Sequence, residues 1–141
     1  MELVAALLKY RGRFLFVEKR GLYTIPTGKF DDEKDKLVDG EVNFEKTIFR
    51  EMKEEFKIKK KNIRIVETLG EITFGEYNFK VISCNVRKPS KIKSFTEGKF
   101  FVWMKKSNLM DNLFLDKLAK KALEMYFLKH PLKRTFFSQS E

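Results

Sequence analysis

The sequence contains only one cysteine, Cys84, and one histidine, His130. This scarcity excludes a disulfide framework and a zinc site built from cysteine and histidine ligands. It also excludes a Ser-His-Asp or Cys-His catalytic centre unless His130, near the C-terminal end, takes part in it. Cys84 lies in the stretch KVISCNV and is most simply a buried strand residue. A reducing compartment suits such a chain, so we predict a cytoplasmic protein.

Long hydrophobic runs are also absent. No stretch of 18 or more apolar residues occurs, so we expect no membrane span. The N-terminal MELVAALLKYRGR carries Glu2 in place of a basic region and has no small-residue cleavage site, which predicts a strand rather than a signal peptide. The 141 residues, 43% of them hydrophobic, suffice for one core. We expect a single domain over residues 1–130 and a flexible tail over residues 131–141.

The charge is strongly one-sided, with a net value of +10. Such a field attracts polyanions, including nucleotides, nucleic acid and acidic membranes. A generally lysine-rich composition is the simpler explanation, since the runs KIKKKN and RKPSKIK fall in expected loops. No nucleic-acid-binding module is recognisable, so the charge alone does not favour a nucleic-acid partner.

The first forty residues have the pattern of a hairpin followed by a loop. Apolar runs at 2–10 and 13–20 flank Arg11-Gly12 and predict the hairpin. A short extended piece ends at Pro26. The charged stretch TGKFDDEKDKLVDGEV, beginning at Thr27, predicts a long loop, and long loops inside compact domains are often functional.

A helical period begins after Asn43, a plausible N-cap residue. One apolar stripe at spacings of three and four follows it, formed by Phe44, Ile48, Phe49, Met52 and Phe56.

The rest of the chain predicts three strands and a second helix. The strands are expected over 62–75, 77–86 and 100–106, with turns near Gly70 and Gly75-Glu76 and a loop over 87–99. The helix around 113–128 has an apolar face of Leu115, Leu118, Ala119, Ala122, Leu123 and Tyr126. This order predicts an α+β or α/β sandwich in which a mixed β-sheet lies between helices.

Three glutamates stand together in the stretch REMKEEFKI. Glu51, Glu54 and Glu55 are spaced i, i+3 and i+4, so they share one side of the first helix, away from its apolar seam. Like charges at this spacing destabilise a helix by about 0.2–0.5 kcal/mol per pair. Arg50 and nearby lysines could neutralise them as an ordinary solvated face. Alternatively the carboxylates hold Mg²⁺, which binds carboxylate oxygens together with water and substrate phosphates.

REMKEEFKI resembles the core of the Nudix hydrolase signature. That signature has a glycine, five residues, a glutamate, seven residues, and then Arg-Glu-apolar-any-Glu-Glu-any-Gly-apolar. Its last part is matched by Arg50, Glu51, Met52, Glu54, Glu55 and Ile58. Upstream, IPTGKF is similar to the Pro-Gly-Gly segment that opens the signature, through Pro26, Gly28, Lys29 and Phe30.

The sequence departs from the signature at two glycines and in one spacing. Thr27 and Lys57 replace glycines, and Lys57 should end the helix with φ > 0 at a cost of about 1 kcal/mol. Gly28 and Arg50 are 22 residues apart, against 14 in the signature. Gly40-Glu41 resembles the usual Gly-Glu but lies one residue further from the arginine, so DDEKDKLVD is interpreted as an insertion.

The resemblance implies an α/β/α sandwich and a set of metal ligands. By this resemblance Glu51, Glu54 and Glu55 bind Mg²⁺ or Mn²⁺, Arg50 orients Glu51, and Thr27 contributes its backbone carbonyl. TEGKFFVWM is similar to a family stretch in which a glutamate before a tryptophan strand is a further metal ligand or the base. Glu97 takes that place, although a glutamate in Glu-Gly is equally a turn residue.

The implied reaction is hydrolysis, by metal-activated water, of a diphosphate linkage in a nucleotide. The substrate-binding residues expected are Lys19, Arg20, Gly28, Lys29 and Asp116. Exposed basic residues are common at strand ends, and Asp116 is also a favourable acidic residue at a helix start. Two alternatives stay open, namely a Nudix-fold nucleotide-binding regulator without catalysis and an RNA-end pyrophosphohydrolase. We expect a monomer or homodimer that acts on a small nucleotide and not at a membrane.

Overall fold

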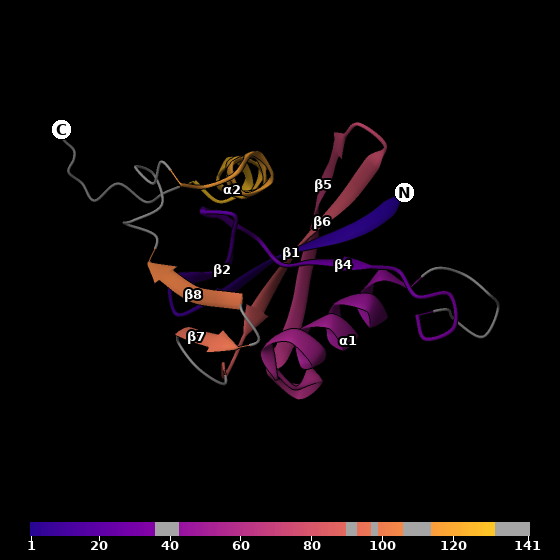
Figure 1. The fold of residues 1–141 in the computed structure, drawn as a ribbon, viewed down its shortest axis with the longest axis horizontal. Coiled ribbons are helices and arrows are strands. Elements are labelled where there is room, and N and C mark those ends of the chain that lie inside the picture. The colour runs from indigo at the N-terminus through magenta and orange to yellow at the C-terminus, as the bar shows by residue number, and fades with distance from the viewer. Residues whose placement is uncertain (36–42, 90–92, 97–98, 106–113, 132–141) are drawn as a thin grey trace.

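The computed structural model describes residues 1–35, 43–89, 93–96, 99–105 and 114–131. Within these residues a mixed β-sheet lies between two α-helices, which confirms the predicted α+β fold (Figure 1). The strands are β1 (Glu2–Tyr10), β2 (Arg13–Lys19), β3 (Leu22–Thr24), β4 (Thr27–Lys29), β5 (Ile63–Phe74), β6 (Tyr77–Val86), β7 (Lys93–Thr96) and β8 (Lys99–Lys105). The helices are α1 (Phe44–Phe56) and α2 (Lys117–Lys129), and a 3₁₀ turn η1 (Lys60–Asn62) precedes β5.

The main path of the sheet runs β5-β6-β1-β2-β8-β7, with β3 paired to β2 and β4 to β1. The β1–β6 pair is parallel, and the other pairs are antiparallel. The predicted hairpin is confirmed, because β1 and β2 are joined through Arg11 and Gly12, both with positive φ. Two positive φ angles match the right-handed strand twist at a two-residue turn.

The edge of β1 that faces β2 is shared between two partner strands. Near its end β1 pairs with β2, through Tyr10 opposite Arg13. Near its start it pairs with β4 instead, where Val4 lies opposite Gly28. β1 and β2 therefore diverge, and β4 enters the gap between them. This division brings the residues around Gly28 into the sheet beside α1.

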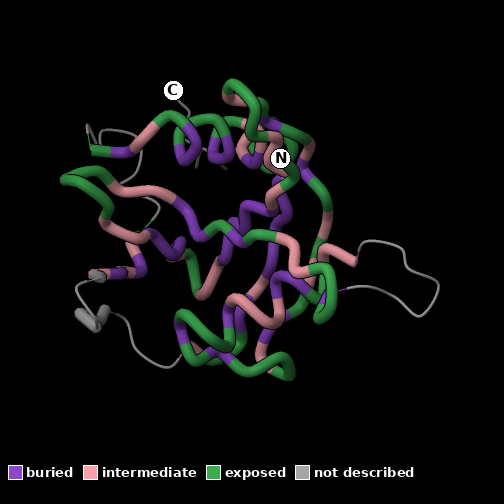
Figure 2. The backbone as a smooth tube through the Cα atoms, turned by 45° about the vertical axis from the view of Figure 1, so that its right-hand side comes forward, coloured by how far each residue is buried: buried purple, intermediate pink, exposed green. Residues whose placement is uncertain are grey.

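The helices cover opposite faces of the sheet, and alternate residues of β1 point to each (Figure 1). Val4, Ala6 and Leu8 pack with the core on the α1 face, which contains Ile48, Met52, Phe56, Leu15 and Trp103. Ala5 and Leu7 pack with the core on the α2 face, together with Phe14, Phe16, Leu118, Ala122 and Tyr126. The buried segments in Figure 2 accordingly run along the strands and the inner side of each helix.

The ends of α1 follow local rules. The Asn43 side chain accepts hydrogen bonds from the backbone N–H groups of Glu45 and Lys46, as an N-cap does. The predicted apolar stripe faces the sheet, with Ile48 and Met52 buried. At the other end Lys57 has φ 57° and ψ 30°, the left-handed conformation that its place in the signature predicts.

Three expectations about the chain path were wrong. Residues from Thr27 were expected to form loop only, yet Thr27–Lys29 form β4 because they satisfy the free edge of β1. Gly70 makes no turn and lies within β5 at a register shift, where a Cβ would approach Met125 of α2 to 2.5 Å. The expected loop over 87–99 contains β7, which pairs with β8.

Other expectations were confirmed by the described residues. The turn at Gly75-Glu76 joins β5 and β6, and Cys84 is buried, which raises the pKa of its thiol to about 12.

No helix in the described part of the chain is long and apolar enough to cross a membrane. The expected tail lies outside the described residues from residue 132 onwards, and the domain boundaries stay a prediction.

Candidate active site

Arg50 lies at the centre of a hydrogen-bonded network on α1. Its guanidinium donates from Nε and Nη2 to the two carboxylate oxygens of Asp35, at 3.0 and 2.8 Å. Nη2 also donates to the backbone carbonyl of Lys29 at 2.9 Å, and Nη1 donates to Glu51 at 2.9 Å and to Glu54 at 3.3 Å. A planar five-donor group suits this arrangement, since the bidentate pair with Asp35 fixes the plane and the remaining donors reach the glutamates.

Asp35 is the buried partner in this network, and it is a functional residue that was not predicted from the sequence. Its side chain is only 1% exposed, and it also accepts hydrogen bonds from Thr47 Oγ1 at 2.9 Å and from the Asp31 N–H at 2.8 Å. Burial by itself raises the pKa of the Asp35 carboxyl, but the hydrogen bonds from Arg50, Asp31 and Thr47 outweigh it and lower the pKa overall. Asp35 is therefore an ionised and fully hydrogen-bonded anchor for Arg50.

The signature contained a signal that could have identified Asp35. Asp35 follows Gly28 by seven residues, one more than separates the glycine of the signature from its first glutamate. The extra length between Gly28 and Arg50 therefore falls mostly after Asp35. The Gly40-Glu41 pair that was compared with the signature lies outside the described residues.

Glu51 is held between Arg50 and β4. Its side chain is 16% exposed, and a Cβ on Gly28 would lie 2.6 Å from Glu51 Cγ, so only glycine leaves room for this side chain. Burial raises the pKa of the Glu51 carboxyl; Arg50 opposes this effect, and the charges of Glu55 and Glu54 add to it. Glu51 thus carries its negative charge at a free-energy cost that a cation in contact with it would reduce.

Glu51 and Glu55 line the same cavity, which has a volume of about 300 Å³. Thr27 and Lys19 also line it, from β4 and β2. Glu54 is half-exposed beside Arg50 and is absent from the lining. Among the residues that the structure describes, no three acidic, histidine or cysteine side chains gather into a preformed metal cluster.

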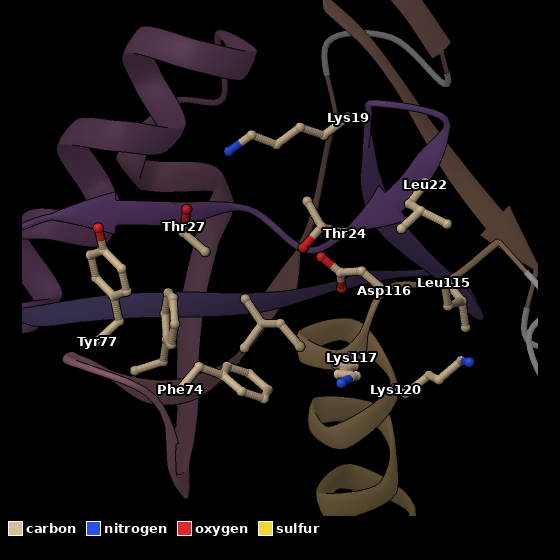
Figure 3. A pocket seen from close by; sticks show the side chains of 12 residues that line it. Lys19, Leu22, Thr24, Thr27, Phe74, Tyr77, Leu115, Asp116, Lys117 and Lys120 are labelled. Atoms are coloured by element: carbon tan, nitrogen blue, oxygen red, sulfur yellow. The ribbon is translucent and has the colours of Figure 1, made fainter.

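A second and larger cavity, of about 720 Å³, adjoins the first. It lies between the sheet and the start of α2, and Lys19, Thr24 and Thr27 line both cavities. Its apolar wall includes Phe74, Phe79 and Leu118, with Tyr77 at its edge (Figure 3). Lys117, Lys120 and Asp116 line it from α2. The two cavities together form a trough that has glutamates at one end and aromatic side chains at the other.

The predicted substrate-binding residues have different positions relative to this trough. Lys19 lines both cavities, and its side chain extends toward the side on which Thr27 lies (Figure 3). Asp116 lines the larger cavity, and its Oδ1 accepts a hydrogen bond from the Ala119 N–H as the N-cap of α2. Arg20 forms the exposed β2–β3 turn with φ 54° and lines neither cavity. Lys29 contributes its backbone carbonyl to Arg50.

The other predicted residues fall outside the trough or outside the described part of the chain. Glu97, the expected additional metal ligand or base, lies outside the described residues. His130 ends α2, where it is hydrogen-bonded to Glu67 and packs against the ring of Tyr126. It lines neither cavity, so the cavities depend on no histidine in the described part of the chain.

No protein-family model matches this sequence, and no curated protein does either. Solved structures do match. A Nudix-family hydrolase from Clostridium perfringens superposes with a TM-score of 0.65 at 13% identity, over 90% of this chain and 96% of that one. The Ap4A hydrolase of C. elegans gives 0.59 at 16% identity, over 92% and 97%. The C-terminal domain of mouse MUTYH, solved in complex with human PCNA, gives 0.63 at 15% identity, over 94% and 92%.

These similarities define the fold of the chain. These three matches cover at least 90% of both chains, and further Nudix-family structures also match, so this chain has the Nudix fold that its sequence resemblance predicted. Identities of this size show the fold alone, and fold does not determine chemistry.

Proposed function

We propose that this protein is a metal-dependent hydrolase that cleaves a diphosphate linkage in a nucleotide. The observation that carries the proposal is the pairing of two glutamates, Glu51 and Glu55, with an aromatic cavity in one trough. A nucleotide needs both environments, because its phosphates require cations and its base requires an apolar wall. The similarity in fold to Nudix hydrolases and to an Ap4A hydrolase supports the same class of substrate.

Mg²⁺ or Mn²⁺ fits the residues at the glutamate end. Glu51 and Glu55 offer hard carboxylate oxygens four residues apart on one helix, with Glu54 beside them, and Mg²⁺ requires few protein ligands. Burial raises the pKa of Glu51, and the charges of Glu55 and Glu54 add to this effect, so a cation bound beside Glu51 would favour its ionised form. When bound, the metal ion supplies two effects, offsetting of the diphosphate charge and a lower pKa for the attacking water.

The side chains of the protein position these groups. Arg50 holds Glu51 through the 2.9 Å hydrogen bond and is itself fixed by Asp35, so the carboxylate has little freedom to rotate away. Lys19 lines both cavities, so its ammonium can bind phosphates that lie at the junction of the two. Thr27 lies at the same junction and, in this proposal, contributes its backbone carbonyl to the metal site.

The larger cavity is the proposed site of the base. Its aromatic residues, Phe74, Tyr77 and Phe79, provide surfaces for stacking. Asp116 has one oxygen committed to the cap of α2 and a second that only accepts hydrogen bonds while ionised. The proposal therefore favours bases that present N–H donors to this carboxylate.

A panel of nucleotides incubated with Mg²⁺, with phosphate and pyrophosphate release as readouts, tests the proposal. We expect turnover by the wild-type protein, its loss in Glu55→Gln and Glu54→Gln, and no change in Glu33→Gln, which alters an exposed carboxylate outside both cavities. Divalent-ion binding should be measured in parallel by calorimetry.

Other outcomes would replace the proposal. Nucleotide binding without any turnover would indicate a regulatory binding protein. Turnover confined to RNA ends would indicate an RNA-end pyrophosphohydrolase. If the protein bound no divalent ion at millimolar concentration, the catalytic proposal would be wrong.

A further inference from the structure

One end of the sheet carries basic side chains from β2, β5 and β8, from the β1–β2 turn and from the residues directly after β6. The pairing register places these strand ends together, since Ile63 lies opposite Val86 and Lys9 lies beside Asn85. On the other side Arg13 lies opposite both Tyr10 and Lys105. Figure 1 shows the ends of β6 and β8 on the same lower left side of the molecule. We name this surface the basic end and define it by Arg11, Arg13, Arg64, Arg87, Lys88 and Lys105.

The charge of the basic end is not neutralised within the described residues. No ion pair there joins any of its six side chains to a carboxylate. The Arg87 N–H donates to the Asn62 carbonyl at 2.7 Å, which places the lysines of η1 next to this surface. Glu67 of β5 is already engaged by Lys129 and His130. Like charges held together in this way attract a polyanion strongly.

An aromatic side chain lies among these cations. Tyr10, at the end of β1, is half-buried and packs edge-on against Trp103 with ring centroids 6.0 Å apart. The guanidinium of Arg11 lies 5.6 Å from the centre of the Tyr10 ring. A fixed aromatic ring flanked by cations is the combination on which single-stranded nucleic acids stack their bases and anchor their phosphates.

The opposite end of the sheet carries several carboxylates. Glu2 and Glu71 lie there, and both accept hydrogen bonds from the side chain of Asn78. Glu76 lies in the β5–β6 turn at the same end, where its carbonyl accepts a hydrogen bond from the N-terminal amino group of the chain. Lys80 lies opposite Glu71 and Lys29 lies opposite Leu3, so carboxylates and cations are mixed at that end, whereas the six side chains of the basic end are all cationic.

We propose that the basic end binds single-stranded nucleic acid. An acidic membrane is less suitable, because Val66 is the only exposed large apolar side chain among the described residues that lies within two positions of any of the six cations in sequence. The surface is separate from the trough and shares no residue with its lining. It therefore adds a binding function to the proposed hydrolysis and does not depend on it.

Fluorescence anisotropy with a labelled twelve-nucleotide oligo(U) tests this inference in EDTA, so that no turnover interferes. If four phosphates are neutralised, log K falls against log salt with a slope of about −3, which is a loss of about 50-fold between 50 and 200 mM salt. The double variant Arg87→Gln/Lys88→Gln, which leaves two phosphates neutralised, should reduce the slope to about −1.4. Tyr10→Leu, which keeps an apolar side chain against Trp103, should weaken binding several-fold without changing the slope.

The matched control is Lys34→Gln/Lys121→Gln, which removes two charges from exposed side chains away from the basic end. Its slope should equal that of the wild type. Equal losses in the control and the Arg87/Lys88 variant would overturn the inference, since diffuse charge would then explain the binding. So would tighter binding to phosphatidylserine vesicles than to the oligonucleotide, or no binding at 50 mM salt.

Discussion

Gly28 and Glu51 are in direct contact across the junction of β4 and α1, because a Cβ at residue 28 would come within 2.6 Å of Glu51 Cγ and 3.2 Å of its Cδ. The pairing of β4 with β1 holds Gly28 in place, so the glutamate side chain would have to move. The identity of a strand residue therefore decides where a helix carboxylate lies.

This contact predicts the effect of Gly28→Ala. The added methyl group should displace the Glu51 side chain and lower both Mg²⁺ affinity and turnover at least tenfold. The free energy of unfolding should fall by only about 1 kcal/mol, because a flexible side chain can yield. Calorimetric Mn²⁺ titration and urea unfolding measure the two effects. Gly12→Ala is the control, since φ 74° strains its backbone far from the glutamates and should leave metal affinity unchanged.

The buried pair of Asp35 and Arg50 predicts a large loss of stability in Asp35→Asn. Removing one partner leaves the guanidinium short of its main counter-charge and should cost about 3 kcal/mol, measured by urea unfolding. Asp32→Asn, which alters an exposed neighbour, should be close to neutral. Exposed substitutions usually change the free energy of unfolding by less than about 0.5 kcal/mol. A difference between the two variants below that value would contradict the role given to Asp35.

The same residue predicts an acid transition. Because the pKa of Asp35 is lowered in the folded state, its contribution to stability is present above the unfolded pKa of about 3.9. That contribution is lost as the pH falls through the lowered folded value. Unfolding followed from pH 6 to pH 2 should therefore show a steeper loss in the wild type than in Asp35→Asn.

Glu51 predicts a pH dependence of stability with the opposite sign to that of Asp35. Its pKa is raised in the folded state, so its contribution favours folding while it is protonated and is lost as the pH rises from the unfolded value through the raised one. In EDTA at pH 7, Glu51→Gln should therefore be at least as stable as the wild type. Millimolar Mg²⁺ should raise the melting temperature of the wild type and leave that of Glu51→Gln unchanged. A Mg²⁺ effect of equal size in both proteins would place the ion elsewhere.

The left-handed conformation of Lys57 predicts a stabilising substitution. Lys57→Gly should raise the free energy of unfolding by about 1 kcal/mol, because glycine adopts φ 57° without a Cβ penalty. Lys59→Gly, at φ −74°, should instead lower it by about 0.5–1 kcal/mol. Guanidinium unfolding of both variants measures the contrast, and turnover should be retained in Lys57→Gly.

Two substitutions separate the structural and binding roles of Asp116. Asp116→Ala should cost about 1 kcal/mol through loss of the cap of α2, whereas Asp116→Ser should keep the cap. If Asp116 reads the base, Asp116→Ser should still change the ratio of kcat/KM between nucleotides that differ in their N–H donors. An unchanged ratio would leave capping as the sole role of Asp116.

The regular elements could be predicted because each depends on neighbouring residues. The stripe of α1 and its Asn43 cap are local patterns, and so is the hairpin at Arg11-Gly12. β4 and β7 could not be predicted, because three or four residues become a strand only when a partner edge is free. Gly70 was assigned to a turn because the close approach of Met125 depends on how α2 packs.

The candidate site also has a part that could be predicted from the sequence and a part that could not. The spacing of Glu51, Glu54 and Glu55 along one helix is visible in the sequence, and their side of the helix follows from it. Which of them line a cavity depends on β4 and β2, which are distant in sequence. Asp35 was missed because a longer stretch separates it from Arg50 than the signature has between its glutamate and its arginine, although the spacing from Gly28 pointed to it.

The backbone hydrogen bond from the Asn43 N–H to the Asp35 carbonyl, at 3.1 Å, has an evolutionary consequence. Asp35 and Asn43, which flank positions 36–42, are held next to each other by this hydrogen bond. Segments of different length can therefore be exchanged between these two points at little thermodynamic cost. A sequence pattern with fixed spacing does not match a chain in which such a segment has changed length. Distant proteins of one fold can therefore keep their carboxylates in place and still not match the pattern.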